Sequence, residues 1–371
     1  MKVLMVEHFL PGSVYTLELC RALRTEEQIT IFCRKGAPRP LEGVQWKDKL
    51  YAGGKGWAEA LMRYGGGLLA LAAEICTGHY DVLHVQGFKD ARYEIPLYCK
   101  LKRHCGILVH TVHNLLPHEA SPRDRRLYGD FYRVCDLLVV HNLYCRQLLM
   151  DEYHLPPEKI CVTPHGSYTQ ISPKEHQLHT EKTEFLQFGV LRRYKGVDIL
   201  LEALARMTET QRSRVHVTVA GQQFPKLDAT DYAALIREKG LEGCVTLQLG
   251  HVPDEALDAL YQEADFCLFP YREIYGSGAL LMAYSYSKPV LASSIPAFEE
   301  ETDGGCTGLL FPPEEPDALK DAILRAADWT EKTYTGTQSH IRQLVEEKYN
   351  WKHSAECLAE GYRNAWQRKQ R

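Results

Sequence analysis

The sequence lacks several short motifs that would assign it to a class of protein directly. It has no C-x-x-C pair, and no G-x-G-x-x-G follows its first predicted strand. These absences argue against a zinc or redox thiol motif and against a nicotinamide-binding domain. No apolar run approaches the ~20 residues of a membrane span, and the sequence contains no internal repeat. The first apolar run, in MKVLMVEHF, is too short for a signal peptide and is soon interrupted by charge.

Cysteine is plentiful, but the pattern does not suggest pairing. The 12 cysteines are scattered singly, and several stand inside apolar segments, as at Cys33, Cys135, Cys161 and Cys267. Without a secretory signal we interpret them as reduced core thiols rather than disulfides or metal ligands. The expected compartment is the cytoplasm.

Composition indicates a globular protein large enough for two domains. The chain has 371 residues, of which 45% are hydrophobic and 25% charged. That length can bury two full cores. The formal net charge of -4 gives no reason to expect a nucleic-acid partner.

Short apolar runs alternate with helical periodicity along the whole chain. The strands predicted in the first half are Lys2–Val6, Gln28–Cys33, Tyr80–Gln86, Gly106–Thr111, Asp136–His141 and Lys159–Thr163. Those in the second half are Glu184–Phe188, Val215–Ala220, Val245–Leu249, Phe266–Pro270, Val290–Ala292 and Cys306–Phe311. The pattern predicts an α/β fold with two parallel-sheet, Rossmann-like domains in series. A polar stretch without periodicity, Ser167–Thr183, separates them, so we expect domains at 1–175 and 176–345 and a terminal helical segment at 346–371.

The stretch Phe266–Ala292 combines a strand, a polar loop and a capped helix. Ser277 stands where an N-cap belongs, and helix formers continue until Lys288-Pro289 stops them. The first N–H groups of such a helix lack intrahelical acceptors and lie at its positive end, so they can bind a phosphate. An ordinary cap on a connecting loop is the alternative. Glu273 adds a carboxylate to the loop.

Polar side chains follow two predicted strands of the first half. His84 lies near the end of one strand, and His113, His118 and Glu119 follow the next. Ligands of open α/β sheets bind beyond the carboxyl ends of the strands. A single histidine is more often structural, but several such residues after successive strands favour a site containing His113. Gly12, after the first strand, would let a ligand approach the backbone.

Basic residues gather in one strand-to-helix loop of the second half. Arg192, Arg193 and Lys195 come between the strand Glu184–Phe188 and a helix with apolar spacing. Arginine and lysine placed in this way suit a diphosphate, although a solvated basic turn is common. Two other basic clusters lie in the first half, at residues 100–104 and 123–126. Most such clusters are solvated, and contact with anionic lipid is the alternative.

Taken together, these residues resemble glycosyltransferase family 4, whose members use nucleotide sugars and have the GT-B fold. The resemblance extends over nearly the whole chain. It rests on TVHNLLPHE (Thr111–Glu119), PHG (Pro164–Gly166), FGVLRRYKGVDILLEA (Phe188–Ala203), DEALDALYQEADFCLFPYR (Asp254–Arg272) and KPVLAS (Lys288–Ser293). It implies two Rossmann-like domains facing across a cleft. The first would hold the acceptor and the second the donor, with the final helix crossing back onto the first.

The resemblance also implies roles for individual residues. His113 matches a histidine near the reacting sugar carbon, and Glu273 is the carboxylate expected to act there. Gly12, His118 and Glu119 are expected on the acceptor side. The residues expected to bind the donor are Arg192, Lys195, Val252, Ser277, Gly278, Ala279 and Leu280.

The sequence departs from the family pattern at two donor positions. The family arginine usually precedes the lysine by five residues, where this chain has Val190, so Arg192 is the expected substitute and Arg193 the second choice. The family also has two glutamates spaced E-x7-E. Glu273 can stand for the first, but Met282 occupies the second position and cannot accept a hydrogen bond from ribose. Either another group, with Glu299–Glu301 as the candidates, binds the ribose, or the donor is recognised in a different way.

The expected function is transfer of a hexosyl group from a nucleoside diphosphate sugar to a hydroxyl on a glycan, a lipid-linked sugar or a small molecule, in polysaccharide biosynthesis. No cofactor or metal is expected, because the sequence has no D-x-D pair to hold a cation, so protein cations must stabilise the leaving diphosphate. Resemblance favours retention of configuration; inversion would need a base such as His113 or Glu119. The alternatives are a UDP-sugar 2-epimerase and a non-catalytic protein that binds a sugar or a lipid head group.

Overall fold

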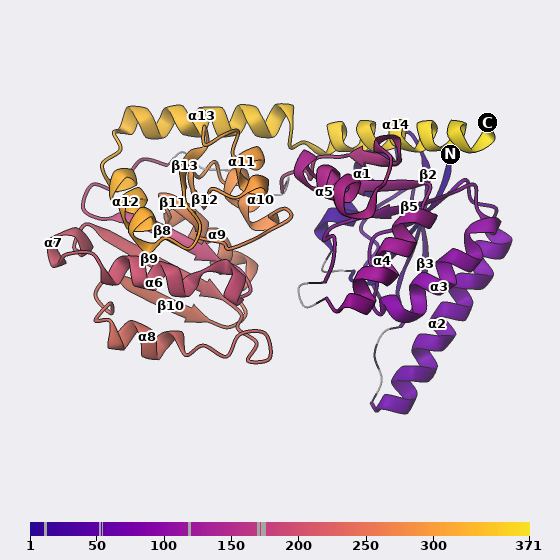
Figure 1. The fold of residues 1–371 in the computed structure, drawn as a ribbon, viewed down its shortest axis with the longest axis horizontal. Coiled ribbons are helices and arrows are strands. Elements are labelled where there is room, and N and C mark those ends of the chain that lie inside the picture. The colour runs from indigo at the N-terminus through magenta and orange to yellow at the C-terminus, as the bar shows by residue number, and fades with distance from the viewer. Residues whose placement is uncertain (11–12, 52, 54, 118–119, 169–170, 172–175) are drawn as a thin grey trace. The chain divides into compact units, whose positions relative to one another are not determined.

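The computed structural model describes residues 1–10, 13–51, 53, 55–117, 120–168, 171 and 176–371. The chain forms two compact units (Figure 1). One consists of Met1–Gly166 with Asn350–Arg371, and the other of Ser167–Tyr349. Both are α/β units built on a parallel sheet, as the alternation of strands and helices predicts. The sequence placed the boundaries a few residues away, after residues 175 and 345.

Within the described residues, the first unit holds a seven-stranded sheet in the order β3-β2-β1-β4-β5-β6-β7. All neighbouring strands are parallel, and the central strand β1 is buried from Val3 onward. Burial on both faces explains why most of these strands are continuous apolar runs. The strands are β1 (Lys2–Glu7), β2 (Gln28–Arg34), β3 (Gln45–Leu50), β4 (Val82–Val85), β5 (Ile107–Thr111), β6 (Leu137–Val140) and β7 (Ile160–Val162).

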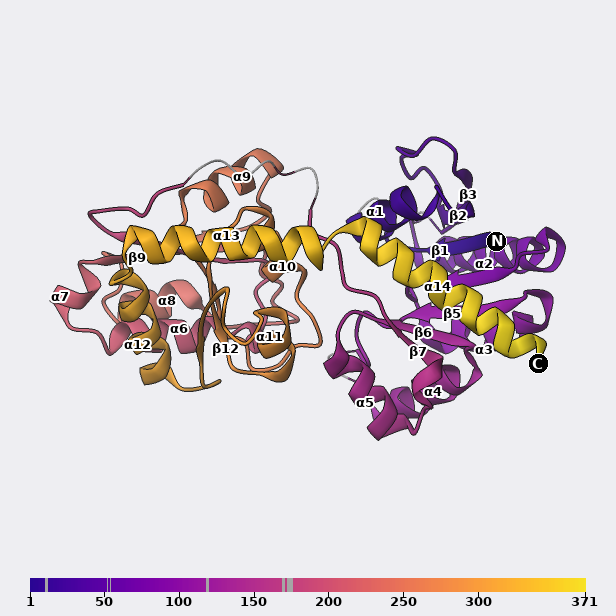
Figure 2. The same ribbon diagram turned by 90° about the horizontal axis from the view of Figure 1, so that it is seen from above.

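Helices cover both faces of this sheet. They are α1 (Val14–Leu23), α2 (Trp57–Gly78), α3 (Ala91–Leu101), α4 (Pro122–Val134), α5 (Leu143–Tyr153) and α14 (Trp351–Gln370). Figure 2 shows α14, the last helix of the chain, running across β5, β6 and β7. Its buried side chains Leu358 and Tyr362 join the core formed by Val3, Leu19 and Val109. The C-terminal segment is therefore part of the first unit.

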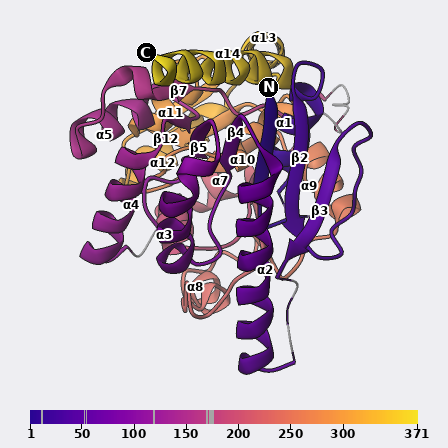
Figure 3. The same ribbon diagram turned by 90° about the vertical axis from the view of Figure 1, so that its right-hand side faces the viewer.

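The long helix α2 lies beside the edge strand β3 (Figure 3). The sequence prediction assigned no structure here because glycines are frequent. At Gly67 the helix and β3 approach so closely that a Cβ would lie 3.2 Å from the carbonyl oxygen of Lys49. A glycine at this position therefore permits the contact between helix and sheet.

The second unit, over the residues that can be described, has a six-stranded parallel sheet in the order β10-β9-β8-β11-β12-β13. Its strands lie within a few residues of the predicted ranges. They are β8 (Thr183–Phe188), β9 (Val215–Gly221), β10 (Val245–Leu249), β11 (Phe266–Phe269), β12 (Val290–Ser293) and β13 (Gly308–Phe311). Successive residues of β11 belong to opposite faces: Phe266 and Leu268 pack in one core, and Cys267 and Phe269 in the other.

The helices of this unit divide between the two cores. They are α6 (Val197–Ala205), α7 (Glu209–Arg212), α8 (Tyr232–Glu238), α9 (Asp254–Glu263), α10 (Gly278–Ser285), α11 (Pro296–Glu301), α12 (Pro316–Ala327) and α13 (Glu331–Glu347). Helix α13 begins at Glu331 and buries Tyr334, Gln338 and Ile341 along one side. None of the helices that the structure describes is long and apolar enough to cross a bilayer. All 12 cysteines are free thiols.

Candidate active site

The loop after β11 and the start of α10 form as the sequence predicts. Ser277 is the N-cap: its Oγ accepts a hydrogen bond from the N–H of Leu280 at 3.2 Å. The carbonyl of Ser277 also accepts from Leu280 and Leu281. Among the described residues, the N–H groups of Gly278 and Ala279 therefore have no backbone acceptor. The first turn of α10 keeps two donors for a ligand at its positive end.

Leu280 is the exception within the predicted phosphate segment. Its side chain is fully buried in the core, and its N–H is already bonded to Ser277. Within the first turn of α10, as far as the structure describes its neighbours, the backbone donors left for a ligand are those of Gly278 and Ala279. The predicted contact from Leu280 is not available in this conformation.

Lys195 lies against the same loop. It belongs to the 3-10 turn η3 (Arg193–Lys195) between β8 and α6. Its Nζ is 5.5 Å from the centroid of the Tyr271 ring. Burial, followed by the neighbouring Tyr194, raises the pKa of Tyr271 well above its usual value, and the adjacent Ser277 side chain opposes that shift. Tyr271 therefore touches both Lys195 and the cap of α10.

Arg192 and Lys195 form a pair of cations without an acidic partner among the described residues. Arg192 is half-buried, and Lys195 lies so close that the two charges repel. Burial, and after it the charge of Arg192, lower the pKa of Lys195 to about 8. Holding two like charges together in a partly buried position is unfavourable. An anion bound between them would remove this penalty.

Arg272 differs from these two cations because it is fully paired. It makes a bidentate contact with Asp198, at 2.7 and 3.0 Å, and its Nε donates to Glu314 at 3.0 Å. Its backbone N–H donates to the carbonyl of Tyr194 at 2.7 Å. Arg272 thus ties the β11 loop to the turn carrying Lys195. The sequence showed Arg272 at the end of a matched segment but not the tertiary partners that define this role.

The two loops also meet through backbone. Gly196 has φ of 68°, and a Cβ at this position would lie 1.9 Å from the carbonyl oxygen of Pro270. Gly189 is similar, because a Cβ there would lie 2.4 Å from Nζ of Lys195. Side chains at these positions would push the basic turn away from the β11 loop.

The remaining donor-side residues occupy the same edge of the sheet. Val252 is half-buried and follows β10, and Glu273 is exposed in the loop after β11. Met282 is partly buried against the core beneath α10, which suits its apolar side chain. Two of the candidates for the ribose contact differ in position. Glu299 accepts a hydrogen bond from Ser294, directly after β12, whereas the backbone carbonyl of Glu301 accepts one from Tyr284, near the C-terminal end of α10. Of these two, Glu299 lies at the edge where the donor residues gather.

His113 lies at the carboxyl edge of the first unit's sheet, within a cluster of aromatic side chains. Its Nε2 is 3.3 Å from Oε1 of Gln86, and its Nδ1 is 3.2 Å from Nε2 of His141. Burial, and after it the nearby His141 and His165, keep the pKa of His113 well below 6.5. A neutral imidazole has one N–H and cannot donate to both neighbours. His113 is thus a neutral imidazole, and each of its ring nitrogens already has a hydrogen-bonding neighbour.

Tyr15 organises this cluster. Its ring contacts His113, His141, His165 and Trp351, with centroid separations between 4.8 and 5.4 Å. The sequence prediction missed Tyr15 and His141. A signal existed for His141, because it is the last residue of the predicted strand Asp136–His141, and His113 lies two residues beyond the end of the predicted strand Gly106–Thr111.

The structure corrects the place of His84. It lies inside β4, fully buried, with ring nitrogens 2.6 Å from the hydroxyl of Tyr362 and 2.7 Å from that of Thr111. Burial lowers its pKa to about 3. His84 is a core residue rather than part of the edge. The other predicted acceptor-side residues, Gly12, His118 and Glu119, lie outside the described residues.

A parallel sheet in each half, with cationic and helix-end groups at the carboxyl edge of the second, is the arrangement of GT-B glycosyltransferases. Comparison with known families specifies the class. Residues 12–170 match the family described as Glycosyltransferase Family 4, and residues 182–328 match Glycosyl transferases group 1. The chain belongs to the GT-B glycosyltransferases of the family 4 type.

Relatives of known name agree with this assignment. D-inositol 3-phosphate glycosyltransferase from Corynebacterium aurimucosum is 25% identical over 390 residues, covering 95% of this chain and 90% of that protein. GDP-mannose:glycolipid 4-beta-D-mannosyltransferase from Xanthomonas campestris pv. campestris is 27% identical over 236 residues, covering 59% and 63%. Both are named as sugar transferases, in agreement with the family matches.

Solved structures share the fold over almost the whole chain. Sucrose-phosphate synthase from Thermosynechococcus elongatus superposes with a TM-score of 0.80 at 18% identity, covering 98% of both chains. The Anabaena protein HepE in complex with UDP and glucose gives 0.74 at 16% identity, covering 97% of this chain and 98% of that one. At these identities the likeness establishes the GT-B fold.

Proposed function

We propose that this enzyme transfers a hexosyl group from a nucleoside diphosphate sugar to a hydroxyl acceptor without a metal ion at the diphosphate. The observation that carries the proposal is the pair of cations, Arg192 and Lys195, which have no described acidic partner, together with the position of Lys195 over Tyr271, the residue that borders the N-cap of α10. A diphosphate would neutralise the two positive charges and would accept hydrogen bonds from the N–H groups of Gly278 and Ala279. The same contacts would stabilise the diphosphate as it leaves.

The ribose and base would lie along the same edge. We assign the ribose contact to Glu299, because Met282 is apolar and Glu301 contacts the C-terminal end of α10. Val252 would lie against the base, and Glu273 would face the sugar. The relatives whose names or bound ligands include GDP-mannose and UDP-glucose support a nucleotide sugar as donor.

Retention of configuration is the proposed outcome. Inversion requires a strong base opposite the leaving group, whereas His113 has a pKa held well below 6.5. In a retaining reaction the departing phosphate can accept the proton of the acceptor hydroxyl. His113 would then position the sugar as a neutral hydrogen-bonding group, and the acceptor would bind near Gly12, His118 and Glu119.

Nucleotide binding tests the central step. UDP, GDP, ADP and dTDP are screened by the shift in Tm, since a ligand that binds only the folded protein raises it. Lys195→Met should weaken binding of the best nucleotide about 10–100-fold, the loss expected for a charge-assisted contact. Lys288→Met is the matched control, because burial also lowers the pKa of Lys288 to about 8 but its Nζ bonds the carbonyl of Gln262 at the other edge. Equal affinity in wild type and Lys195→Met would refute the assignment.

Product analysis separates the remaining alternatives. The donor that binds is incubated with and without candidate acceptors, and the anomeric configuration of the product is measured by NMR. A transferase of this kind yields a retained glycoside only when acceptor is present. An epimer formed without acceptor would support a 2-epimerase, and binding without turnover on any acceptor would support a binding protein.

Peripheral contact with a membrane, at the cytoplasmic face, is a further part of the proposal. Helix α2 has an apolar outer side: the exposed fraction is 82% for Trp57, 71% for Met62, 74% for Leu69 and 58% for Leu61. Its first turn projects beyond the rest of its unit (Figure 1, Figure 3). Exposed Trp and Leu side chains at the end of a helix suit the interface of a bilayer.

The basic clusters predicted from sequence support this contact less well. Lys102 pairs with Asp136 at 2.7 Å and Arg125 with Glu152 at 2.8 Å, so part of their charge is neutralised. Sedimentation with anionic vesicles is the test. Trp57→Ser with Met62→Ser should abolish binding, while Leu249→Ser, at an exposed leucine of the other unit, should not. Binding that survives the double substitution would argue against α2.

A further inference from the structure

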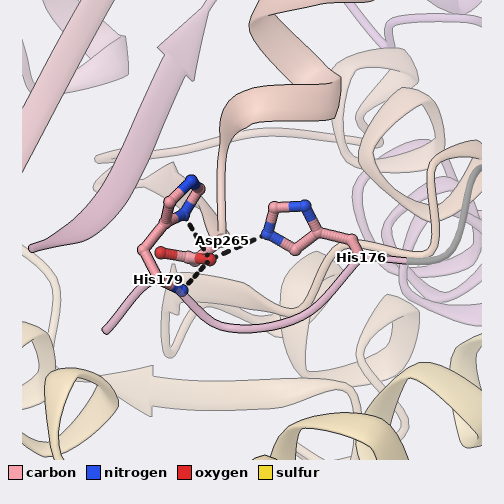
Figure 4. A group of neighbouring side chains, drawn as sticks. All are labelled: His176, His179 and Asp265. Carbon is pink, nitrogen blue, oxygen red and sulfur yellow. Dashed lines mark hydrogen bonds and ion pairs between the residues drawn. The ribbon is translucent and has the colours of Figure 1, made fainter. Parts of the chain in front are cut away.

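Two histidines and an aspartate converge at the amino edge of the second unit's sheet. Asp265 directly precedes β11, and His176 and His179 come from the segment before β8 (Figure 4). Oδ1 of Asp265 is 2.8 Å from Nε2 of His176 and 3.0 Å from Nδ1 of His179. Figure 4 shows the two rings on either side of the carboxylate, each directing one nitrogen at it. In sequence, Asp265 is 89 residues from His176 and 86 residues from His179.

Oδ1 of Asp265 is approached by more hydrogen-bond donors than one carboxylate oxygen can accept well. Besides the two ring nitrogens, the backbone N–H of His179 lies 3.2 Å from Oδ1. A carboxylate oxygen offers about two lone pairs, so three donors on one atom exceed its capacity. One cation between the two rings and the oxygen would satisfy all three side chains at once.

We propose that His176, His179 and Asp265 bind a divalent first-row transition ion of the zinc type. Two imidazole nitrogens and a carboxylate oxygen are donors that such ions prefer, and magnesium and calcium do not favour imidazole. With metal–ligand bonds of about 2.0–2.1 Å, tetrahedral geometry needs donor separations of about 3.3 Å. The observed 2.8 and 3.0 Å are close to this separation, and all three donor atoms lie within 4.8 Å of one another, so a small adjustment of the two rings would bring them around one ion.

The surroundings of the cluster fit an ion site. Asp265 is fully buried, and its second oxygen accepts the N–H of Glu184 at 2.8 Å, which fixes the direction of the first. The hydroxyl of Tyr334 donates to the Asp265 carbonyl at 2.8 Å. Outer contacts of this kind orient metal ligands. His179 is 44% exposed at its side chain, which leaves the fourth position to water.

The proposed ion has a structural role. The segment carrying both histidines begins the second unit, and Leu178 packs against its core while its N–H donates to Glu331 at 3.1 Å. An ion would fasten this segment to β11. Lys195 and Ser277 lie at the opposite, carboxyl edge of the same sheet, so the proposal of a metal-free diphosphate site is unaffected. The two proposals stand independently.

A second cluster of possible metal ligands must be removed by substitution before metal binding is measured. Asp303, Cys306 and His340 also lie close together at the surface and could take up ions. The test therefore uses the full chain carrying Cys306→Ser and His340→Asn. In this background the stoichiometry and Kd of Zn²⁺ and Co²⁺ are measured by titration, together with the Tm and the visible absorption of bound Co²⁺.

The expected result is one ion per chain, a tetrahedral Co²⁺ spectrum and a higher Tm with the ion. His176→Asn and His179→Asn should each weaken binding at least about 100-fold, since even outer contacts cost roughly 10–100-fold. His154→Asn is the matched control: His154 is exposed with φ of 53°, a conformation that asparagine tolerates. No saturable binding, or equal binding in all three variants, would overturn the proposal and leave a hydrogen-bonded cluster.

Discussion

The Lys195 ammonium lies over the ring of Tyr271, 5.5 Å from its centroid, and Tyr271 in turn borders the N-cap Ser277. One buried phenol thus joins the cationic turn before α6 to the first turn of α10. Lys195 and Ser277 therefore approach the same side chain at the carboxyl edge of the second unit's sheet.

Removing the charge of Arg192 should have little effect on the free energy of unfolding, whereas removing that of Arg272 should lower it. Arg192→Met should change the free energy of unfolding by less than about 0.5 kcal/mol, because no described acid pairs with it. Arg272→Met should cost about 1–3 kcal/mol, since it leaves Asp198 without its bidentate partner. Urea unfolding measures both, and nucleotide titration should show the larger loss of affinity in Arg192→Met. Equal destabilisation would contradict the difference in pairing.

Lys195 should contribute to stability a component that rises with pH between about 8 and 10.5, against the opposite contribution of buried thiols such as Cys33 and Cys105, whose pKa is raised to about 11 by burial. Its pKa is about 8 in the folded protein and 10.5 when unperturbed. In this window the unfolded chain binds a proton that the folded chain does not, so the free energy of unfolding increases, by at most about 1.4 kcal/mol per pH unit. Lys288 contributes in the same direction. Unfolding titrations at several pH values isolate this component: the free energy of unfolding of wild type minus that of Lys195→Met should increase between pH 8 and 10.5.

Nucleotide affinity should have the opposite dependence on pH. A diphosphate binds the protonated form of Lys195, so affinity should fall by up to about tenfold per pH unit above pH 8. Calorimetric titration from pH 7 to 9.5 measures this decline. A decline of the same steepness in Lys195→Met would assign it to another group.

Gly196→Ala should disrupt the contact between the two loops. Alanine would have both an unfavourable φ of 68° and a clash with the Pro270 carbonyl. We expect a loss of more than about 2 kcal/mol. Gly240→Ala provides the control, because Gly240 has φ of 60° but open space around it, and should cost only about 1 kcal/mol. Similar losses in the two variants would show that the close approach to Pro270 is unimportant.

The rate of the enzyme should not fall between pH 8 and 6 through protonation of His113. Burial and the neighbouring histidines keep its pKa well below 6.5, so the ring stays neutral across this range. The pH profile of kcat is the measurement. An acidic limb near pH 6.5 that disappears in His113→Gln would identify the ring as a general base and favour inversion.

Local sequence signals were sufficient for the stretch Phe266–Ala292. The apolar run, Ser277 and Lys288-Pro289 each act within a few residues, and the strand, cap and helix formed as predicted. Helix α2 was not predicted because its glycines disfavour a helix locally, and packing against β3 compensates for that preference. The polar edge strand β3 was missed for a similar reason: it is half-exposed and lacks an apolar run.

Pairings between distant segments could not be predicted from one sequence. The contact between Arg272 and Asp198 depends on how two loops meet, and no local pattern records it. Likewise the difference between Glu299 and Glu301 depends on which segment each one contacts in the folded chain. Residue type and spacing identified the candidates, and only the fold could distinguish them.

Helix α14 also has a consequence for synthesis on the ribosome. The first 166 residues emerge without the side chains of Trp351, Leu358 and Tyr362, which complete their core. The second unit is continuous in sequence and can fold as soon as it is released from the exit tunnel. The unit that is translated first therefore becomes complete only after the second unit has been made, and its apolar face stays exposed until α14 has emerged.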